Sequence, residues 1–155
     1  MLQHSDIKAC IFDMDGLLFD TEALCIEVWQ SIGKKKGIEI SYDLFLQCVG
    51  RNSHDTKSIV LSALGQEFLY ETFFSEARKE MLHYMDVNGV PEKEGAKNLL
   101  LWLYNQKIPI ALATSSSKES ASWMIEKAGL TKYFSAFAFG SEVARGKPEP
   151  DIFLL

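Results

Sequence analysis

The fold of this chain is decided by the stretch Ile11-Phe12-Asp13-Met14-Asp15-Gly16-Leu17-Leu18-Phe19-Asp20-Thr21-Glu22. An apolar run, residues 7–12, ends there in two aspartates one residue apart, followed by a glycine. Such a run is typical of a buried parallel strand, and α/β proteins bind ligands beyond the carboxyl ends of these strands. Because side chains alternate along a strand, we expect Asp13 and Asp15 to point the same way. The alternative is a strand that runs into an ordinary Asp-Gly turn.

The composition indicates one soluble globular domain, or one domain with a small insertion. Apolar residues make up 47% of the chain and charged residues 24%, and the net charge of −5 gives no support for binding to nucleic acid or to a membrane surface. No segment has the roughly 18 apolar residues of a membrane span, and no signal peptide is present. Cys10, Cys25 and Cys48 lie far apart in apolar surroundings, which predicts reduced thiols and a cytoplasmic protein.

The hydrophobic pattern predicts three strands separated mainly by helices. We expect strands at 7–13, 108–114 and 137–140, and helices at about 22–36, 92–106 and 118–128, between 41 and 85, and from Asp151 onward. Thr21 is a candidate cap for the first of these helices, and Pro91 suits the start of the helix at 92–106. The alternation of helix and strand after Pro91 indicates an α/β fold with a parallel sheet. We therefore predict a Rossmann-like core formed by residues 1–16 and 89–155, with residues 17–88 as an inserted all-helical cap domain.

Polar side chains follow each of the three predicted strands. Asp13 and Asp15 follow the first strand, Thr114-Ser115-Ser116 end the second, and Lys147 lies in a loop after the third. In a parallel sheet these strand ends converge. The set suits a phosphate dianion, because hydroxyl and N–H groups donate to its oxygens, lysine neutralises its charge and a carboxylate can attack the phosphorus.

In this order, the three motifs resemble those of the haloacid dehalogenase superfamily, in the β-phosphoglucomutase-like phosphatase subfamily with a small helical cap. The motifs are Asp13-Met14-Asp15-Gly16 with Asp20-Thr21-Glu22, Leu112-Ala113-Thr114-Ser115-Ser116, and Gly146-Lys147-Pro148-Glu149-Pro150-Asp151-Ile152-Phe153. The resemblance covers nearly the whole chain. It implies Mg²⁺-dependent hydrolysis of small phosphate monoesters, of sugar or nucleotide type, through an aspartyl-phosphate.

The resemblance also implies a role for each matched residue. Asp13 is expected to be the nucleophile, and Asp15 the acid that protonates the leaving group and then the base that activates water. The Thr114 hydroxyl and the neighbouring Ser115-Ser116 pair are expected to bind the phosphoryl group, and Lys147 to hold nucleophile and phosphate together. Mg²⁺ is expected to be bound by an Asp13 oxygen and the Asp15 carbonyl.

Two residues of the cap are candidates for substrate binding. Val49-Gly50-Arg51-Asn52 resembles the specificity loop of the subfamily, which makes Arg51 a candidate contact to the substrate. Glu22, beside the linker, is the second candidate. The alternatives are a surface arginine after a helix-ending glycine and a carboxylate in the first turn of a helix, where the helix dipole favours it.

The sequence departs from the subfamily at two points. Cys25 lies near the position of a histidine that β-phosphoglucomutases carry in the cap, which favours a hydrolase over a mutase. The fourth acidic motif of the family, which follows a fourth strand and completes the Mg²⁺ site, is absent from a sequence that ends at Leu155. We therefore expect weak or absent metal binding, an exposed edge on the first strand, and a truncated form of a longer phosphatase.

Three functions remain open for this chain. The first is a phosphatase of small phosphorylated metabolites, monomeric in its full-length form and without nucleic-acid or membrane partners. The second is a phosphosugar mutase, which needs a bisphosphate activator and releases little phosphate. The third is a catalytically inactive fragment that retains a phosphate pocket without the metal.

Overall fold

The structure, a computed structural model, describes residues 7–51 and 53–155, and it divides into two compact units. One unit is Met1–Thr21 with Gly89–Leu155, and the other is Glu22–Asn88. The division falls after Thr21 and not after Gly16. The intervening residues stay with the first unit because Phe19, whose side chain is fully buried, bridges to both Asp15 and Glu92. Within the described residues, no helix has the length and apolar character needed to cross a membrane.

The first unit is built on a parallel sheet with the strand order β1-β2-β3. The strands are β1 (Cys10–Phe12), β2 (Ile110–Thr114) and β3 (Ala136–Phe139). Phe12 pairs with Leu112, and Thr114 pairs with Phe139, so the carboxyl ends of the strands lie at one edge of the sheet. The predicted α/β class with a parallel sheet is confirmed.

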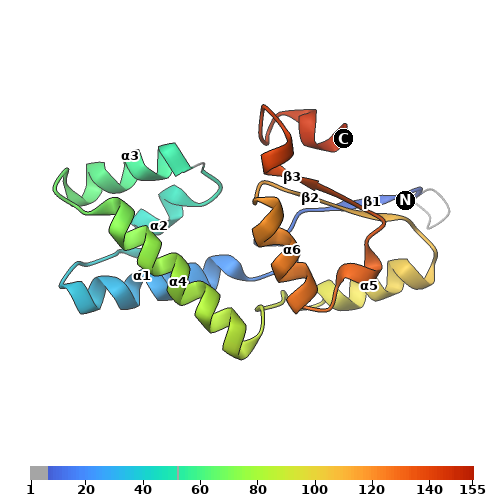
Figure 1. The fold of residues 1–155 in the computed structure, drawn as a ribbon, viewed down its shortest axis with the longest axis horizontal. Helices are drawn as coiled ribbons and strands as arrows, with labels where there is room; N and C mark the ends of the chain where they lie inside the picture. The colour runs from blue at the N-terminus through green and yellow to red at the C-terminus, as the bar shows by residue number, and fades with distance from the viewer. Residues whose placement is uncertain (1–6, 52) are drawn as a thin grey trace. The chain divides into compact units, whose positions relative to one another are not determined.

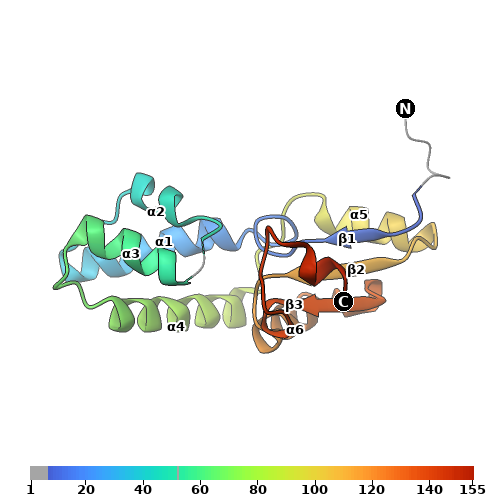
Figure 2. The ribbon, with the colours of Figure 1, turned by 90° about the horizontal axis from the view of Figure 1, so that it is seen from above.

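Helices cover one face of this sheet. α5 (Ala96–Asn105) and α6 (Lys118–Lys127) lie on that face, and the C-terminal segment with the 3₁₀ helix η4 (Pro150–Phe153) lies on the other (Figures 1 and 2). Short 3₁₀ helices at Thr131–Tyr133 and Gly140–Glu142 flank β3. Fully buried aliphatic side chains fill the space between sheet and helices: Leu100, Ile110, Leu112, Ile125 and Leu130.

Two predicted helix starts are wrong. The helix expected from about residue 92 begins only at Ala96, because the preceding residues pair with the segment after β1. Lys93 N donates to Leu18 O over 2.9 Å, and Asp20 N donates to Pro91 O over 2.8 Å. The helix expected from Asp151 is instead the 3₁₀ turn η4. The first two strands are also shorter than expected: the strand predicted at 7–13 pairs over Cys10–Phe12, and the strand predicted at 108–114 pairs over Ile110–Thr114.

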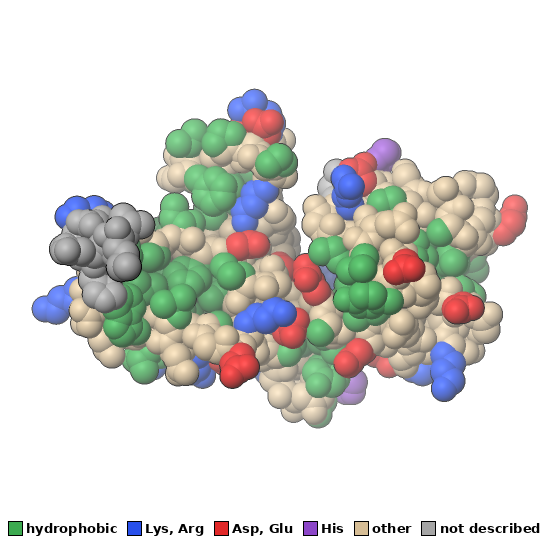
Figure 3. Space-filling view, turned by 180° about the vertical axis from the view of Figure 1, so that it is seen from behind, with side chains coloured by type: hydrophobic (Ala, Val, Ile, Leu, Met, Phe, Trp, Pro, Cys, Tyr) green, Lys and Arg blue, Asp and Glu red, His purple; other side chains and the backbone are tan. Residues whose placement is uncertain are grey.

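β1 is an edge strand of the described sheet. Phe12 is buried against the core, whereas the Ile11 side chain on the opposite face is 52% exposed. Hydrophobic side chains gather on the side of the molecule where β1 and α5 lie (Figure 3). An edge strand of this kind offers unpaired backbone groups together with apolar surface.

The second unit is entirely helical. Its helices are α1 (Thr21–Lys36), α2 (Tyr42–Cys48), α3 (Ser53–Leu64) and α4 (Tyr70–Asn88). Trp29 of α1 connects three of these helices. Its ring lies edge-on to Phe45 of α2 and to Phe74 of α4, with ring centroids 5.5 Å and 4.7 Å apart. Ion pairs Lys35–Glu80 and Lys36–Glu76 add contacts between α1 and α4 at the surface.

Cys25 is a desolvated thiol inside this helical unit. Burial, with smaller contributions from Cys48 and Glu22, raises the pKa of Cys25 to about 12. The pKa values of Cys48 and Tyr70 are raised in the same unit, chiefly by burial. Cys25 is therefore a neutral thiol at neutral pH.

The helices α5 and α6 end in the same hydrogen-bond pattern but with different residues. After α6, Gly129 N donates to Glu126 O and Leu130 N to Ile125 O; after α5, Lys107 N donates to Tyr104 O and Ile108 N to Leu103 O. Both turn residues are left-handed, with φ of 68° for Gly129 and 59° for Lys107. Glycine adopts this conformation freely, whereas an L-residue with a side chain is strained there by about 1–2 kcal/mol.

We predict that Lys107→Gly stabilises the protein. Relief of the left-handed strain outweighs the added freedom of the unfolded chain, which leaves a net gain of about 0.5–1 kcal/mol. Gly129→Ala is the matched control and is expected to destabilise by about 1 kcal/mol. Urea denaturation followed by circular dichroism measures both; a destabilising Lys107→Gly contradicts the assignment of strain.

We also predict that the helical unit loses stability as the pH rises through the alkaline range. The unfolded Cys25 thiol releases its proton near pH 8.5 and the folded thiol only near pH 12, so folding opposes ionisation in this window. Denaturation between about pH 8 and pH 11 should therefore show a falling free energy of unfolding, and Cys25→Ala should flatten that slope. An unchanged slope in the variant contradicts the prediction.

Candidate functional site

An ion pair joins the end of β1 to the loop that follows β3. Lys147 Nζ donates to Asp13 Oδ1 over 2.7 Å and to the Ala113 carbonyl oxygen over 2.8 Å. It also lies 5.6 Å from the ring centroid of Phe153. Asp13 and Lys147 are 134 residues apart in the sequence. The Lys147 side chain is 24% exposed and that of Asp13 46%, so the carboxylate remains accessible while the ammonium is largely enclosed.

The Asp15 carboxylate is held by two hydroxyl groups. Thr21 Oγ1 donates to Asp15 Oδ1, and Ser116 Oγ donates to Asp15 Oδ2, both over 2.9 Å. The turn after Asp15 supports this arrangement, since Gly16 N donates to Phe19 O and φ of Gly16 is 75°. Asp15 therefore has one defined orientation, with both oxygens engaged.

The end of β2 supplies the third part of the site. Thr114 is fully buried, and its Oγ1 accepts a hydrogen bond from Ser116 N over 3.1 Å. Gly140 N donates to Ser116 O, and a Cβ atom at Gly140 would lie 2.3 Å from Ser115 O. Only glycine fits there, so the close approach of the segment after β3 fixes the loop at Ser115 and Ser116.

A forked ion pair shapes the loop that carries Lys147. Arg145 Nε donates to Asp151 Oδ1 over 3.0 Å, and Arg145 Nη2 donates to Asp151 Oδ2 over 2.8 Å. Glu149 N donates to Gly146 O within the same loop. The two-point contact between Arg145 and Asp151 restricts the loop more than a single bond does.

The structure brings most of the predicted site residues to one end of the sheet. Asp13, Asp15 and Lys147 converge there with Thr114-Ser115-Ser116. Thr21 is an additional residue of this cluster that the sequence indicated only as a candidate helix cap. Thr21 belongs to the first motif, but nothing in the local sequence indicates that its hydroxyl bonds Asp15.

The two predicted cap residues lie in the other unit. Glu22 is in the first turn of α1. Arg51 is exposed in the connection between α2 and α3, and Asn52 of the same proposed loop lies outside the described residues. Their roles at the substrate stay predictions.

The donor set suits a hard cation only with help from a bound substrate. Among the residues that the structure describes, no three side chains of histidine, cysteine, aspartate or glutamate are grouped as metal ligands. Within the described part of the chain, Asp13 and Asp15 are the carboxylates of this cluster. Mg²⁺ commonly uses one or two carboxylates and completes its octahedron with water and substrate phosphate, so these residues fit that type of site.

Comparison with known proteins agrees with this geometry. The sequence model of the family "Haloacid dehalogenase-like hydrolase" matches residues 10–155. The chain is 32% identical over 149 residues to a phosphorylated carbohydrates phosphatase of Thermotoga maritima, covering 96% of this chain and 68% of that protein. It is 29% identical over 154 residues to β-phosphoglucomutase of Bacillus subtilis, covering 96% and 67%. The chain thus spans about two thirds of these relatives' length.

Solved structures share the fold. One from Thermotoga maritima superposes with a TM-score of 0.76 at 31% identity, covering 96% of this chain and 68% of that chain. A haloacid dehalogenase family hydrolase from Deinococcus radiodurans, with bound phosphate and sodium, gives a TM-score of 0.74 at 24% identity, covering 95% and 64%. The second likeness supports the fold alone. From its motifs, its strand-end cluster and these matches, the chain belongs to the haloacid dehalogenase-like hydrolase family, in its group of β-phosphoglucomutase-like phosphatases.

Proposed function

We propose that this chain hydrolyses small phosphate monoesters, of sugar or nucleotide type, by way of a phosphorylated Asp13. The observation that carries the proposal is the 2.7 Å contact between Lys147 Nζ and Asp13 Oδ1 at the end of β1, beside a second carboxylate fixed by two hydroxyls. A cation against the nucleophile compensates the negative charge of an incoming phosphate. The phosphatase among the relatives supports the same chemistry.

The first step forms a bond between an Asp13 oxygen and phosphorus and breaks the bond from phosphorus to the ester oxygen. Asp15, once protonated, gives its proton to that leaving oxygen, and the alcohol departs. In the second step Asp15 takes a proton from water, which attacks phosphorus and frees Asp13 and inorganic phosphate. Thr21 and Ser116 orient the Asp15 carboxyl through both steps, since each of them bonds one of its oxygens.

The remaining residues of the cluster bind the phosphoryl group. The Thr114 hydroxyl and the backbone N–H of Ser115 donate to its oxygens, and Lys147 spans the nucleophile and the phosphate. Asp13 and the Asp15 carbonyl would hold Mg²⁺, which neutralises phosphate charge when bound. Because Asp13 is the single carboxylate in this ligand set, we expect the metal to bind weakly in the absence of substrate.

We further propose that the helical unit acts as the cap and the sheet unit as the catalytic core. Two cap residues are proposed to contact the sugar or nucleoside part of the substrate. They are Glu22, in the first turn of α1, and Arg51, in the connection between α2 and α3. Cys25 supports a hydrolase over a mutase, because a thiol with a pKa of about 12 does not exchange its proton readily at neutral pH. Hydrolysis needs no such relay.

The test is phosphate release from a panel of sugar phosphates and nucleoside monophosphates, with and without Mg²⁺. Wild type is expected to release phosphate only with the metal, and Asp13→Asn to lower the rate by about 10³-fold or more, because the amide is a poor nucleophile. Asp43→Asn, the same change at an exposed helix position, controls for the loss of one charge and should retain the rate.

Three results contradict the proposal. Undiminished release in Asp13→Asn rejects Asp13 as the nucleophile. Isomerisation of a phosphosugar that depends on a bisphosphate, with little phosphate released, identifies a mutase instead. Binding of inorganic phosphate without turnover of any monoester by the folded protein identifies the inactive form.

A further inference from the structure

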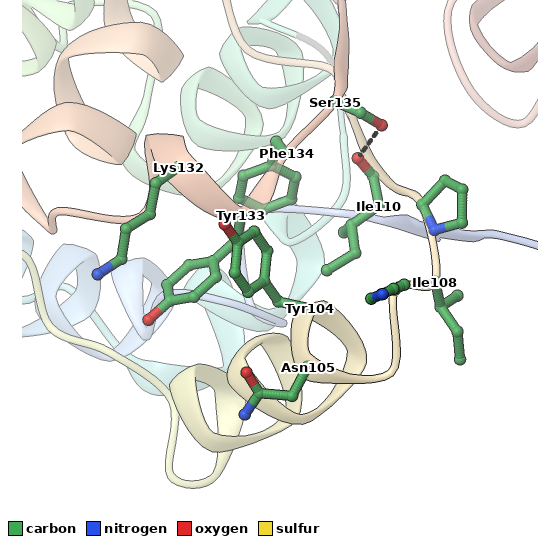
Figure 4. Close-up of a pocket in the computed structure, with 10 residues that line it drawn as sticks. Tyr104, Asn105, Ile108, Ile110, Lys132, Tyr133, Phe134 and Ser135 are labelled. Carbon is green, nitrogen blue, oxygen red and sulfur yellow. Dashed lines mark hydrogen bonds between the residues drawn. The ribbon is translucent and has the colours of Figure 1, made fainter.

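A cavity lies at the opposite end of β2 from the candidate active site. Its volume is about 570 Å³, within the range of small-molecule sites. It is lined by the end of α5, the turn leading into Ile110, and the 3₁₀ segment before β3 (Figure 4). β2 begins at this cavity with Ile110 and ends in the candidate active site with Thr114. The two sites therefore share no residue.

The charge of this cavity is opposite to that of the whole chain. Among the residues that the structure describes, its lining includes Lys107 and Lys132 and no aspartate or glutamate, although the chain has a net charge of −5. Neither lysine forms an ion pair within the part of the chain that the structure describes, whereas lysines 35, 36, 57, 93, 97, 118 and 147 each have a carboxylate partner. Two cations without a counter-charge at one cavity favour an anionic ligand.

The walls of the cavity are aromatic. The rings of Tyr104 and Tyr133 meet edge-on with centroids 5.6 Å apart, and Lys132 Nζ lies 5.1 Å from the Tyr133 centroid. Figure 4 shows the Tyr104 and Tyr133 rings side by side in the middle of the lining, with the Lys132 side chain at one end. Pro109 adds an exposed apolar ring to the wall. Surfaces of this kind bind flat rings by stacking and edge contacts.

Lys107 occupies a position where glycine is the more stable residue. It occupies the left-handed turn after α5, and its counterpart after α6 is Gly129. A strained residue persists where its side chain serves a purpose that glycine does not. Lys107 also lines the cavity, which connects the strained position to the positive charge found there.

We propose that this cavity binds a small anion joined to a flat ring, the chemistry of a nucleoside phosphate. Lys107 and Lys132 contact the anionic group, and Tyr104, Tyr133 and Pro109 contact the ring. The site is separate from the proposed hydrolysis at Asp13, and it goes beyond that function.

The test uses 3′,5′-cyclic AMP in isothermal titration calorimetry, because this phosphodiester is no substrate for hydrolysis of a monoester. Adenosine supplies the ring alone, and inorganic phosphate the anion alone. We expect the cyclic nucleotide to bind wild type more tightly than either part. Lys107→Gly and Lys132→Ala should each weaken that binding by about fivefold to tenfold, since each removes one accessible cation.

Two further variants locate the binding. Lys97→Ala, an exposed lysine of α5 outside the cavity, removes the same charge and should leave the affinity unchanged. Lys147→Ala should also leave it unchanged, since that residue belongs to the candidate active site. Because Lys107→Gly is expected to stabilise the fold, a loss of binding in this variant does not arise from unfolding.

Three outcomes overturn the proposal: no binding of the cyclic nucleotide, binding that is unaffected by Lys107→Gly and Lys132→Ala, or binding that Lys147→Ala abolishes. If adenosine binds as tightly as the cyclic nucleotide, the lysines do not contribute to binding. If inorganic phosphate binds as tightly as the cyclic nucleotide, the aromatic rings do not contribute. Failure of phosphate release at Asp13 does not affect any of these readouts, so the two proposals fail separately.

Discussion

The contact between Lys147 and Asp13 is the interaction on which the rest of the candidate site depends. It joins two segments 134 residues apart, and it forms only because β1 and β3 flank β2 in parallel and end at the same edge of the sheet. The same lysine bonds the Ala113 carbonyl, so one side chain contacts the ends of two strands. The loop around Lys147 is in turn held by the fork between Arg145 and Asp151. Sheet topology and local loop geometry therefore both determine the distance from nucleophile to cation.

The two carboxylates of the site lie in different surroundings, which suit them to different proposed roles. Asp13 meets a cation and stays accessible, which suits a nucleophile. Asp15 meets two hydroxyl groups, which hold its carboxyl in one orientation, as the proposed acid and base requires. Sequence spacing alone, two aspartates one residue apart, does not distinguish these environments. The difference comes from Thr21, Ser116 and Lys147, each of which is positioned by a different segment.

Local patterns in the sequence were enough to predict the parallel sheet, the helical insertion and the strand-end cluster, because apolar strands that end in polar residues are a short-range signal. The predictions failed where distant backbone pairing decides the structure. Pro91 suited a helix start, yet Lys93 pairs with Leu18 and delays the helix to Ala96. Thr21 suited a helix cap, yet its hydroxyl bonds Asp15. The cavity near Lys107 had no local signal either, because α5, the start of β2 and the segment before β3 build it together.

The most direct measurement of the central claim is the identification of the covalent intermediate. The protein is incubated with a phosphate monoester labelled on phosphorus, quenched in acid and digested, and the labelled peptide is identified by mass spectrometry. The account predicts label on the peptide that contains Asp13, and no label in Asp13→Asn. Label on another residue, or phosphate release with no trapped label at any time before steady state, contradicts transfer through Asp13.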